Sequence, residues 1–294
     1  PVQQTKKNFL IKPPNNRTAS RNHQMTIHAS DLPRYHRRNW LAYFSDYVLF
    51  GLGLVFANTA TTLPAFAAQL TDNKVLIGAV SAVWMGGWLL PQIFAANYVS
   101  NKRRKLPVVI KGSWIGRPVL LLFALFLFFG GAQYRSLTLL LFLCTLGFFM
   151  LTDAVVAIAW FDLFGKTMEP QVRGRLIGIG QVTNGTLAIG AGALVGFLVG
   201  PRGPAFPFNF AIIFTLAGLC FMASLWALTF IVEPHEDVPE HRARLREYLP
   251  RLFSLLREDP TFARLNLIRL LVGAAGLAIP FYAIFALQEA GVTA

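Results

Sequence analysis

Long apolar stretches separated by short polar segments dominate the pattern of this 294-residue chain. Most of them run for about 20 residues or more, the length that an α-helix needs to cross the hydrocarbon core of a bilayer. Backbone groups in hydrocarbon must be hydrogen-bonded within the protein, so only helices and closed barrels can span it. Barrel strands are shorter and alternate between apolar and polar positions. The pattern therefore predicts an all-α polytopic membrane protein.

The polar and glycine-rich breaks predict seven membrane-spanning helices. The first six form one bundle over residues 39–232, and the seventh lies within residues 261–294 as the start of a second bundle. The expected spans are residues 40–68, 75–99, 106–130, 136–163, 175–199, 207–232 and 262–287. Residues 1–38 are polar and basic and lack the apolar core of a signal peptide, so we expect a largely disordered arm there.

A charged connector, residues 233–260, joins the sixth and seventh spans. Within it, residues 240–258 place apolar side chains on one helical stripe and most arginines elsewhere. This pattern predicts an amphipathic helix that lies along the membrane interface. A soluble linker helix is the alternative.

The distribution of cations along the chain predicts its orientation. Lys and Arg number 27 against 14 Asp and Glu, which gives a net charge of +13. Of the 24 cations outside the spans, 21 lie in alternate connecting segments: before residue 40, and at 102–105, 166–175 and 242–264. Basic loops stay on the cytoplasmic side, so we expect an inner-membrane protein with a cytoplasmic N-terminus. The asymmetry favours anionic lipid as the partner of the basic surface and argues against nucleic acid.

Two connecting segments and the order of the helices carry a family resemblance. Between the second and third spans the chain reads ANYVSNKRRK, from Ala96 to Lys105. After the fourth span, WFDL is followed by a turn that reads EPQVRGR and ends at Arg175. With six helices, a basic amphipathic connector and a seventh helix, these segments resemble the major facilitator superfamily of transporters over residues 40–294.

That family's signature, roughly Gly-x-Leu-x-Asp-x-x-Gly-Arg-Lys/Arg, is matched here only at its cationic end. Ala96, Ser100 and Arg103 stand where the family has Gly, Asp and a second Gly. The residues singled out in this signature loop are Ser100, Lys102, Arg103, Arg104 and Lys105.

The resemblance implies twelve helices in two six-helix bundles, with a small solute bound between them near the midplane. It implies a secondary transporter that works by alternating access, coupled to a proton or a counter-solute, and a protein longer than this chain. The alternative is a non-transporting structural or assembly subunit of a larger membrane complex, which Ser100 in place of the family's Asp favours. Neither is an enzyme, since the sequence contains no phosphate-binding loop and no nucleophile–base constellation. No cofactor or metal site is predicted.

Six ionisable residues fall inside the predicted spans, where a charge is costly unless it is paired, hydrated or close to an interface. They are Asp46, Lys111, Arg117, Asp153, Asp162 and Arg269.

The depths of these charges predict their partners. At about 1.5 Å of rise per residue, Arg117 on the third span and Asp153 on the fourth both lie roughly 15 Å from the cytoplasmic side, so we expect them to pair. Asp46 and Lys111 lie about 8–9 Å deep and form the second predicted pair. Asp162 is expected to pair with two arginines of the following turn, Arg173 and Arg175.

The Arg117–Asp153 pair has two interpretations. It is either a buried ion pair that sets the register of two helices, or a site where Asp153 exchanges a proton or the pair contacts an ionic solute. An adjacent guanidinium favours the ionised carboxylate, which opposes protonation unless the pair separates.

Further polar residues in the spans are candidates for a solute or coupling site, with interhelical hydrogen bonds as the alternative. Together with Asp153 and Asp46, they are Asn58, Thr62, Gln92, Thr145, Thr152, Gln181 and Asn184. The fifth span is also rich in glycine. The spacing of Gly192, Gly196 and Gly200 predicts close contact with a neighbouring helix, or a place where the helix bends.

Overall fold

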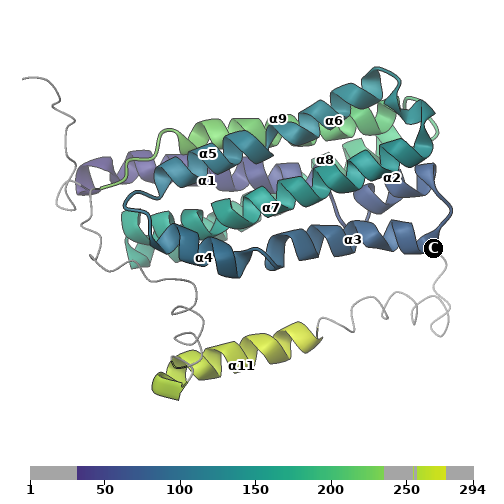
Figure 1. Cartoon of the computed structure of the whole chain (residues 1–294). Coiled ribbons are helices and arrows are strands. Elements are labelled where there is room, and N and C mark those ends of the chain that lie inside the picture. Colours follow the sequence, from purple (N-terminus) through teal and green to yellow (C-terminus); the bar gives the residue numbers. More distant parts are fainter. Residues whose placement is uncertain (1–31, 235–253, 255–256, 276–294) are drawn as a thin grey trace, which may run out of the picture.

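The computed structural model describes residues 32–234, 254 and 257–275, and every regular element within them is helical (Figure 1). The elements are α1 (Leu32–Phe56), α2 (Thr62–Leu70), α3 (Lys74–Leu89), α4 (Gln92–Ser100), α5 (Leu106–Gly116), α6 (Pro118–Phe128), the short 3₁₀ helix η2 (Gly131–Gln133), α7 (Arg135–Thr167), α8 (Pro170–Val199), α9 (Phe208–Leu228) and α11 (Pro260–Ala275).

Within the described part of the chain, six helical segments are long and apolar enough to cross a membrane, which supports the predicted class of a helical membrane protein. They run side by side as one bundle (Figure 1). The segments are Arg34–Phe56, Lys74–Ser100, Leu106–Phe128, Arg135–Thr167, Pro170–Val199 and Phe208–Leu228.

Proline divides two of the predicted spans. The second span breaks into α3 and α4 at Pro91, and the third breaks into α5 and α6 at Pro118. A proline has no N–H, so the carbonyl four residues earlier loses its helical partner, and the ring pushes that turn open. Each span is therefore interrupted at a position set by one residue.

The first span ends earlier than predicted. It was expected to continue to residue 68, but α1 stops at Phe56 and α2 starts at Thr62. The Oδ1 atom of Asn58 accepts hydrogen bonds from the backbone N–H groups of Ala60 and Thr61, at 2.8 and 3.1 Å. Asn stabilises such turns because its short side chain can replace a backbone acceptor.

The start of α1 corrects the predicted boundary of the N-terminal arm. Residues 32–38 were assigned to a disordered arm, but they form the first turns of α1. Pro33 suits the first turn of a helix. Arg38 donates from Nε to the Phe230 carbonyl, and Asn39 exchanges two hydrogen bonds with the backbone of Val232. These contacts tie the beginning of α1 to the chain that follows α9.

Two apolar clusters fill the bundle. The larger one surrounds Phe66, whose ring contacts those of Phe123, Phe142, Phe210 and Phe214 at centroid distances of 4.7–5.8 Å. The smaller one surrounds Tyr43 and lies nearer the end where the cations gather. On α1, α5–α6, α7 and α9 the two clusters occupy separate stretches, and a thin polar layer lies between them.

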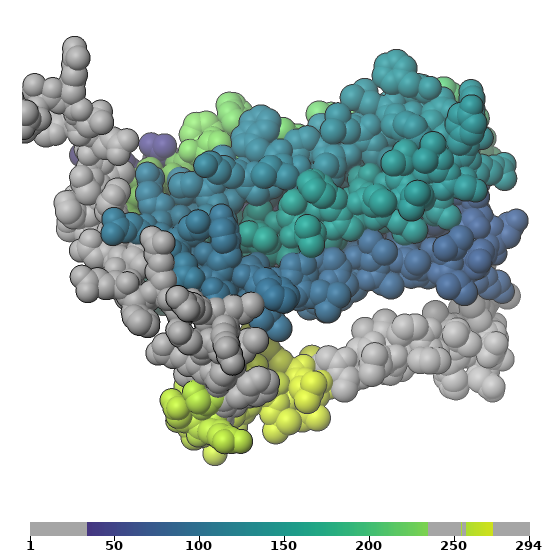
Figure 2. Space-filling model, in the orientation of Figure 1, coloured from purple at the N-terminus to yellow at the C-terminus, as the bar shows by residue number. Residues whose placement is uncertain are grey.

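The helices differ in how far they are buried. Over its most apolar window, α9 is 56% buried, whereas the Lys74–Ser100 segment is 6% buried and α8 is 11% buried. Figure 2 shows the surface of α3 and α4, in blue, along one edge of the bundle. Among the described residues, α8 and the α3–α4 segment therefore present nearly unpartnered apolar faces.

The predicted seventh span begins with α11, which lies apart from the bundle (Figure 1). The remainder of that span, most of the predicted amphipathic helix at 240–258, and residues 1–31 of the arm lie outside the described residues.

Candidate functional site

A buried ion pair forms the centre of the polar layer. The Arg117 Nη1 atom lies 3.7 Å from Asp46 Oδ1, and both side chains are 5% exposed. Arg117 also donates to Ser224 Oγ at 2.8 Å and to the Phe221 carbonyl at 3.2 Å. The Ser224 hydroxyl donates to Asp46 Oδ1. The second oxygen of Asp46 accepts from Trp160 Nε1 at 2.8 Å, so both carboxylate oxygens have donors.

This arrangement corrects the two predicted charge pairs. Arg117 forms its ion pair with Asp46 instead of Asp153, and Lys111 is exposed on α5 without the predicted contact to Asp46. Side chains on a helix lean toward its N-terminus, which for α5 is the cationic end. The long Arg117 side chain is thereby directed toward the depth of Asp46. Counting Cα positions along the span misses this shift.

Asp153 stays close to the pair without joining it. It interacts electrostatically with Arg117 and has Trp88 as a hydrogen-bonding neighbour. Asp153 and Arg117 together line a narrow gap between α5 and α7 and also a larger cavity. The guanidinium thus has one carboxylate as its ion-pair partner and a second one within electrostatic reach.

The larger cavity has a volume of about 560 Å³ and lies between α1, α7 and α8. We call it the central cavity. Trp88, Trp160, Phe50 and Phe161 contribute aromatic surface to its wall. Its polar lining consists of Asp46, Tyr47, Arg117, Asp153, Gln181 and Asn184.

Four of the candidate residues predicted from the sequence meet in the central cavity. Asp46, Asp153, Gln181 and Asn184 come from three helices and line the same space. Asn184 also donates from Nδ2 to the Tyr47 carbonyl at 3.3 Å, which holds α8 against α1, while its Oδ1 atom is buried without a partner. An unsatisfied buried acceptor beside a cavity is a place where a solute could donate a hydrogen bond.

The other polar candidates do not line the central cavity. Asn58 forms the turn between α1 and α2, and Thr62 is buried in the first turn of α2. Thr152 donates to carbonyls of its own helix. Gln92 starts α4 after Pro91, and Thr145 is half-buried on α7.

The residues that sequence reasoning missed are the aromatic ones. Trp88 was not singled out and Trp160 entered only as part of the WFDL segment, yet each indole N–H faces a carboxylate in the polar layer. A buried indole N–H needs an acceptor, but here each acceptor lies on another helix, so no local signal in the sequence identified the pairing.

The side chains of the signature loop contact α4 and α7 at the cationic end. Ser100 donates to the Asn97 carbonyl at 2.9 Å, and the Lys102 ammonium lies 4.4 Å from the centre of the Tyr98 ring. Lys105 Nζ pairs with Asp162 Oδ2 at 3.0 Å and donates to the Val99 carbonyl. Arg103 is exposed.

Asp162 therefore has a different partner from the predicted one. It pairs with Lys105, whereas Arg173 donates to the carbonyls of Gly165 and Met168 at the end of α7, and Arg175 is exposed. The last turn of α7 leaves carbonyls without helical partners. Arg173 satisfies two of them, which is why it turns away from Asp162.

Glu233, another residue that sequence reasoning missed, connects three elements at this end. Its side chain is fully buried and accepts from the backbone N–H groups of Lys105 and Leu106 at 2.7 and 3.0 Å. Lys166 and Arg104 lie 3.6 and 3.8 Å from its oxygens. It thus caps the first turn of α5 from the segment after α9. An acid placed directly after the sixth apolar stretch, before the rest of the charged connector, was the signal in the sequence.

Comparison with known protein families, with curated proteins and with solved structures finds no match to this chain.

Proposed function

We propose that the chain is the solute-binding half of a secondary transporter, and that the solute binds in the central cavity. Transport would follow alternating access and be coupled to a proton, as expected for the major facilitator superfamily that the sequence resembles. The observation that carries the proposal is the presence of Asp153 on the wall of this cavity while Arg117 forms its ion pair with Asp46.

The charge balance of the cavity supports cation or proton binding. Apart from the weakly acidic Tyr47, its ionisable lining consists of two carboxylates, Asp46 and Asp153, and one guanidinium, Arg117. Asp46 and Arg117 neutralise each other, which leaves one carboxylate in excess. A carboxylate in a membrane cavity without its own counter-ion is the usual position of a proton relay or of a contact to a cationic solute.

The size and lining of the cavity support a small amphipathic solute. Ligand sites in proteins have volumes of about 300–1,000 Å³ and combine apolar walls with a few placed polar groups. At about 560 Å³, with four aromatic side chains and several polar ones, the central cavity fits this description.

Breaks in the helices around the cavity support a conformational cycle. Pro91 and Pro118 interrupt the second and third spans. Each of these spans contributes one residue to the cavity wall, Trp88 from the second and Arg117 from the third. Helices bend where the backbone ladder is interrupted. Protonation of Asp153 would weaken its attraction for Arg117 and leave the guanidinium to Asp46 alone. The local charge change would then lie beside a break in the helix.

Placement in the membrane forms part of the proposal. Several cations gather at one end of the bundle, where Arg104 and Lys166 lie near Glu233, Lys105 pairs with Asp162, and Arg38 and Arg173 donate to carbonyls at helix ends. We propose that this cationic end faces the cytoplasm across the inner membrane, with anionic lipids around it.

Two measurements test the function. A thermal-shift screen of small solutes on the purified intact protein is expected to find ligands whose stabilisation is lost in Ala157→Phe, because Ala157 lines the cavity and phenylalanine would fill it. In sealed vesicles, such a solute is expected to drive proton movement that Asp153→Asn abolishes. Asp162→Asn is the matched control, since it lies on the same helix but pairs with Lys105 away from the cavity.

Proton-coupled uptake that persists in Asp153→Asn would exclude this residue as the coupling site. The alternative function is a structural or assembly subunit of a membrane complex. The nearly unpartnered faces of α3–α4 and α8 fit that role as well as they fit a second bundle. Co-purification with a fixed set of other subunits, together with no solute binding, would favour the alternative.

A further inference from the structure

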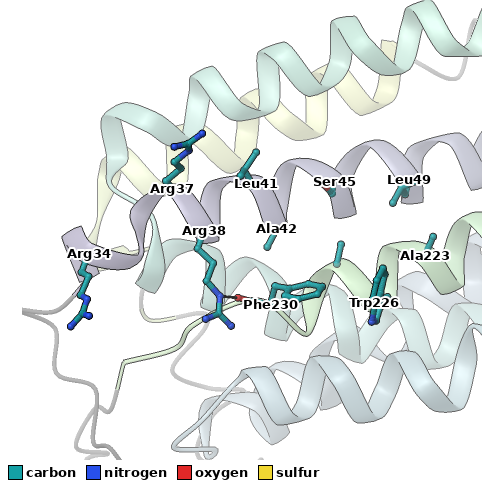
Figure 3. Close-up of a pocket in the computed structure, with 11 residues that line it drawn as sticks. Arg34, Arg37, Arg38, Leu41, Ala42, Ser45, Leu49, Ala223, Trp226 and Phe230 are labelled. Carbon is teal, nitrogen blue, oxygen red and sulfur yellow. Dashed lines mark hydrogen bonds between the residues drawn. The ribbon is translucent and has the colours of Figure 1, made fainter.

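A second hollow lies on the outer side of the bundle, between α1 and α9 at the cationic end (Figure 3). We call it the α1–α9 groove. Its volume is about 1030 Å³, and it shares no lining residue with the central cavity. The groove is therefore a separate candidate site, distinct from the central cavity.

The mouth of the groove is strongly cationic. Arg34, Arg37 and Arg38 line it, and all three are exposed (Figure 3). Arg38 donates from Nε to the Phe230 carbonyl at 2.7 Å, which fixes its guanidinium at the mouth. That bond uses one of the five donors of the group and leaves the terminal nitrogens for another acceptor. Among the described residues, no acidic side chain lines the groove.

The rest of the groove is apolar and has a floor of small residues. Ala42 and Ser45 on α1 face Ala223 and Ala227 on α9, so the surface is hollowed between the two helices. Larger side chains form the walls, with Leu41 and Leu49 on α1, Trp226 on α9 and Phe230 just after α9. Trp226 is 69% exposed and meets the Phe230 ring edge to face.

The length of the groove matches one leaflet of a bilayer. From Arg38 to Leu49 the helix advances eleven residues, or about 16 Å at the usual rise. Half of the hydrocarbon core of a bilayer is about 15 Å thick. The arginines would thus stand at the level of the lipid phosphates while Leu49 reaches the middle of the membrane.

We propose that the α1–α9 groove binds one molecule of an anionic phospholipid. Its phosphate lies among the three arginines, where guanidinium groups form charge-assisted hydrogen bonds with phosphate oxygens. One acyl chain follows the small-residue floor between Trp226 and the leucines of α1. The sequence predicted only a diffuse attraction of the basic side for anionic lipid. The groove supplies a defined site for a single molecule.

The charge of the mouth distinguishes this occupant from a protein. A second copy of the chain packed on the same groove about an axis along the membrane normal would bring two sets of three arginines together. An apolar helix would leave the guanidinium groups without an anion. A phospholipid satisfies both the cationic mouth and the apolar floor.

Native mass spectrometry of the delipidated full chain tests the proposal by titration with phosphatidylglycerol and phosphatidylcholine. We expect one phosphatidylglycerol per chain, bound at least tenfold more tightly than phosphatidylcholine. Arg34→Gln/Arg37→Gln is expected to weaken binding about 30-fold, since each cation near an anionic headgroup contributes about a fivefold factor. Ala223→Phe fills the floor, keeps every cation, and is also expected to weaken binding. The matched control, Arg103→Gln/Arg175→Gln, removes two exposed cations of the same end and is expected to stay within twofold.

Several outcomes would overturn the proposal. Equal weakening in the control variant would show a diffuse attraction, and equal binding of phosphatidylcholine would show no headgroup selection. Unchanged binding in Ala223→Phe would place the lipid elsewhere, and competition by inorganic phosphate at equal concentration would show a simple anion site. A stable dimer that takes up no lipid would assign the groove to a second copy. If the double arginine variant fails to fold, Arg37→Gln alone is expected to lose about fivefold.

Discussion

Arg117 shows how one side chain determines the character of the polar layer. Its guanidinium is the cation that faces two carboxylates, and the pairing with Asp46 binds α1, the α5–α6 break and α9 together through Ser224 and Phe221. The sequence offered two interpretations of an Arg117–Asp153 pair, a structural ion pair or a site of proton exchange, and in the structure two different acids correspond to them. Asp46 takes the structural part, and Asp153 is left for the proposed exchange of a proton.

The variant Arg117→Ala is expected to destabilise the protein by about 3–5 kcal/mol, because it leaves the buried Asp46 carboxylate without its counter-ion. Asp153→Asn keeps the shape of the side chain and leaves Arg117 with its partner. We expect its cost to be no more than about 1 kcal/mol, in line with ordinary substitutions. Unfolding in mixed micelles with a denaturing detergent measures both free energies.

A double variant separates the ion pair from simple loss of packing. Asp46→Asn/Arg117→Gln removes both charges and is expected to be more stable than Arg117→Gln alone, since no buried charge remains unpaired. If Asp153→Asn restores the stability of Arg117→Gln as much as Asp46→Asn does, Asp46 is not the specific partner of Arg117.

Glu233→Ala is a second test at the scale of one residue. The change removes two hydrogen bonds to backbone N–H groups at the start of α5 and the carboxylate that lies near Lys166 and Arg104. We expect a loss of about 3–5 kcal/mol in the same unfolding measurement. The matched control is Glu169→Ala, because Glu169 is exposed before α8 and its side chain makes no cap bond there. Similar losses in both variants would contradict the role given to Glu233.

Close helix packing occurs at glycines other than Gly192 and Gly196, two of the three that the sequence singled out. A Cβ added at Gly112 would lie 2.7 Å from Val156 Cγ2, and one added at Gly116 would overlap the Thr152 side chain, so α5 and α7 approach each other closely there. At Gly192 and Gly196 on α8, no atom of the described residues lies within 4 Å of an added Cβ. The contact predicted for α8 has no partner among these residues.

Gly116→Ala and Gly196→Ala are therefore expected to change the free energy of unfolding differently: the first lowers it, and the second leaves it unchanged or raises it. The first forces α5 away from α7 and is expected to cost about 1–3 kcal/mol, as overpacked sites do. The second is expected to be neutral or to stabilise by up to about 1 kcal/mol, because alanine is the better helix former. Unfolding free energies of the two variants provide the check. A clear loss in Gly196→Ala would show that a further helix packs on this face of α8.

At the scale of the whole molecule, the cations indicate the proposed orientation across the membrane, and the burial of the helices indicates which sides of the bundle face a neighbour in the membrane plane. The cations gather at one end, which sets the proposed orientation across the membrane. The nearly unpartnered faces of α3–α4 and α8 set a lateral direction in which the bundle lacks a neighbour among the described residues.

Cysteine labelling tests the orientation. Cys144 and Cys220 are replaced by alanine, and single cysteines are introduced as Arg103→Cys at the cationic end or Arg202→Cys at the opposite end. A membrane-impermeant maleimide applied to sealed cells is expected to label only Arg202→Cys, and permeabilised cells are expected to give labelling of both. The reverse pattern would invert the proposed topology.

The sequence by itself determined the helical class and, apart from the bounds of the first, the approximate positions of the six spans found among the described residues. These features depend on local composition, because a bilayer requires about 20 apolar residues and internal backbone hydrogen bonds wherever the chain crosses it. The breaks at Pro91 and Pro118 were also readable in principle, since they follow from the missing N–H of a single residue.

Only the tertiary structure decided which charges pair and which residues share a cavity. Depth along a helix is a one-dimensional quantity, whereas pairing depends on how each helix is rotated and on the direction in which its side chains lean. Arg117 reached Asp46 for that reason, and Asp153 was left beside the central cavity. The α1–α9 groove arises in the same way, from small residues on two helices 178 or more positions apart that become neighbours only in the folded bundle.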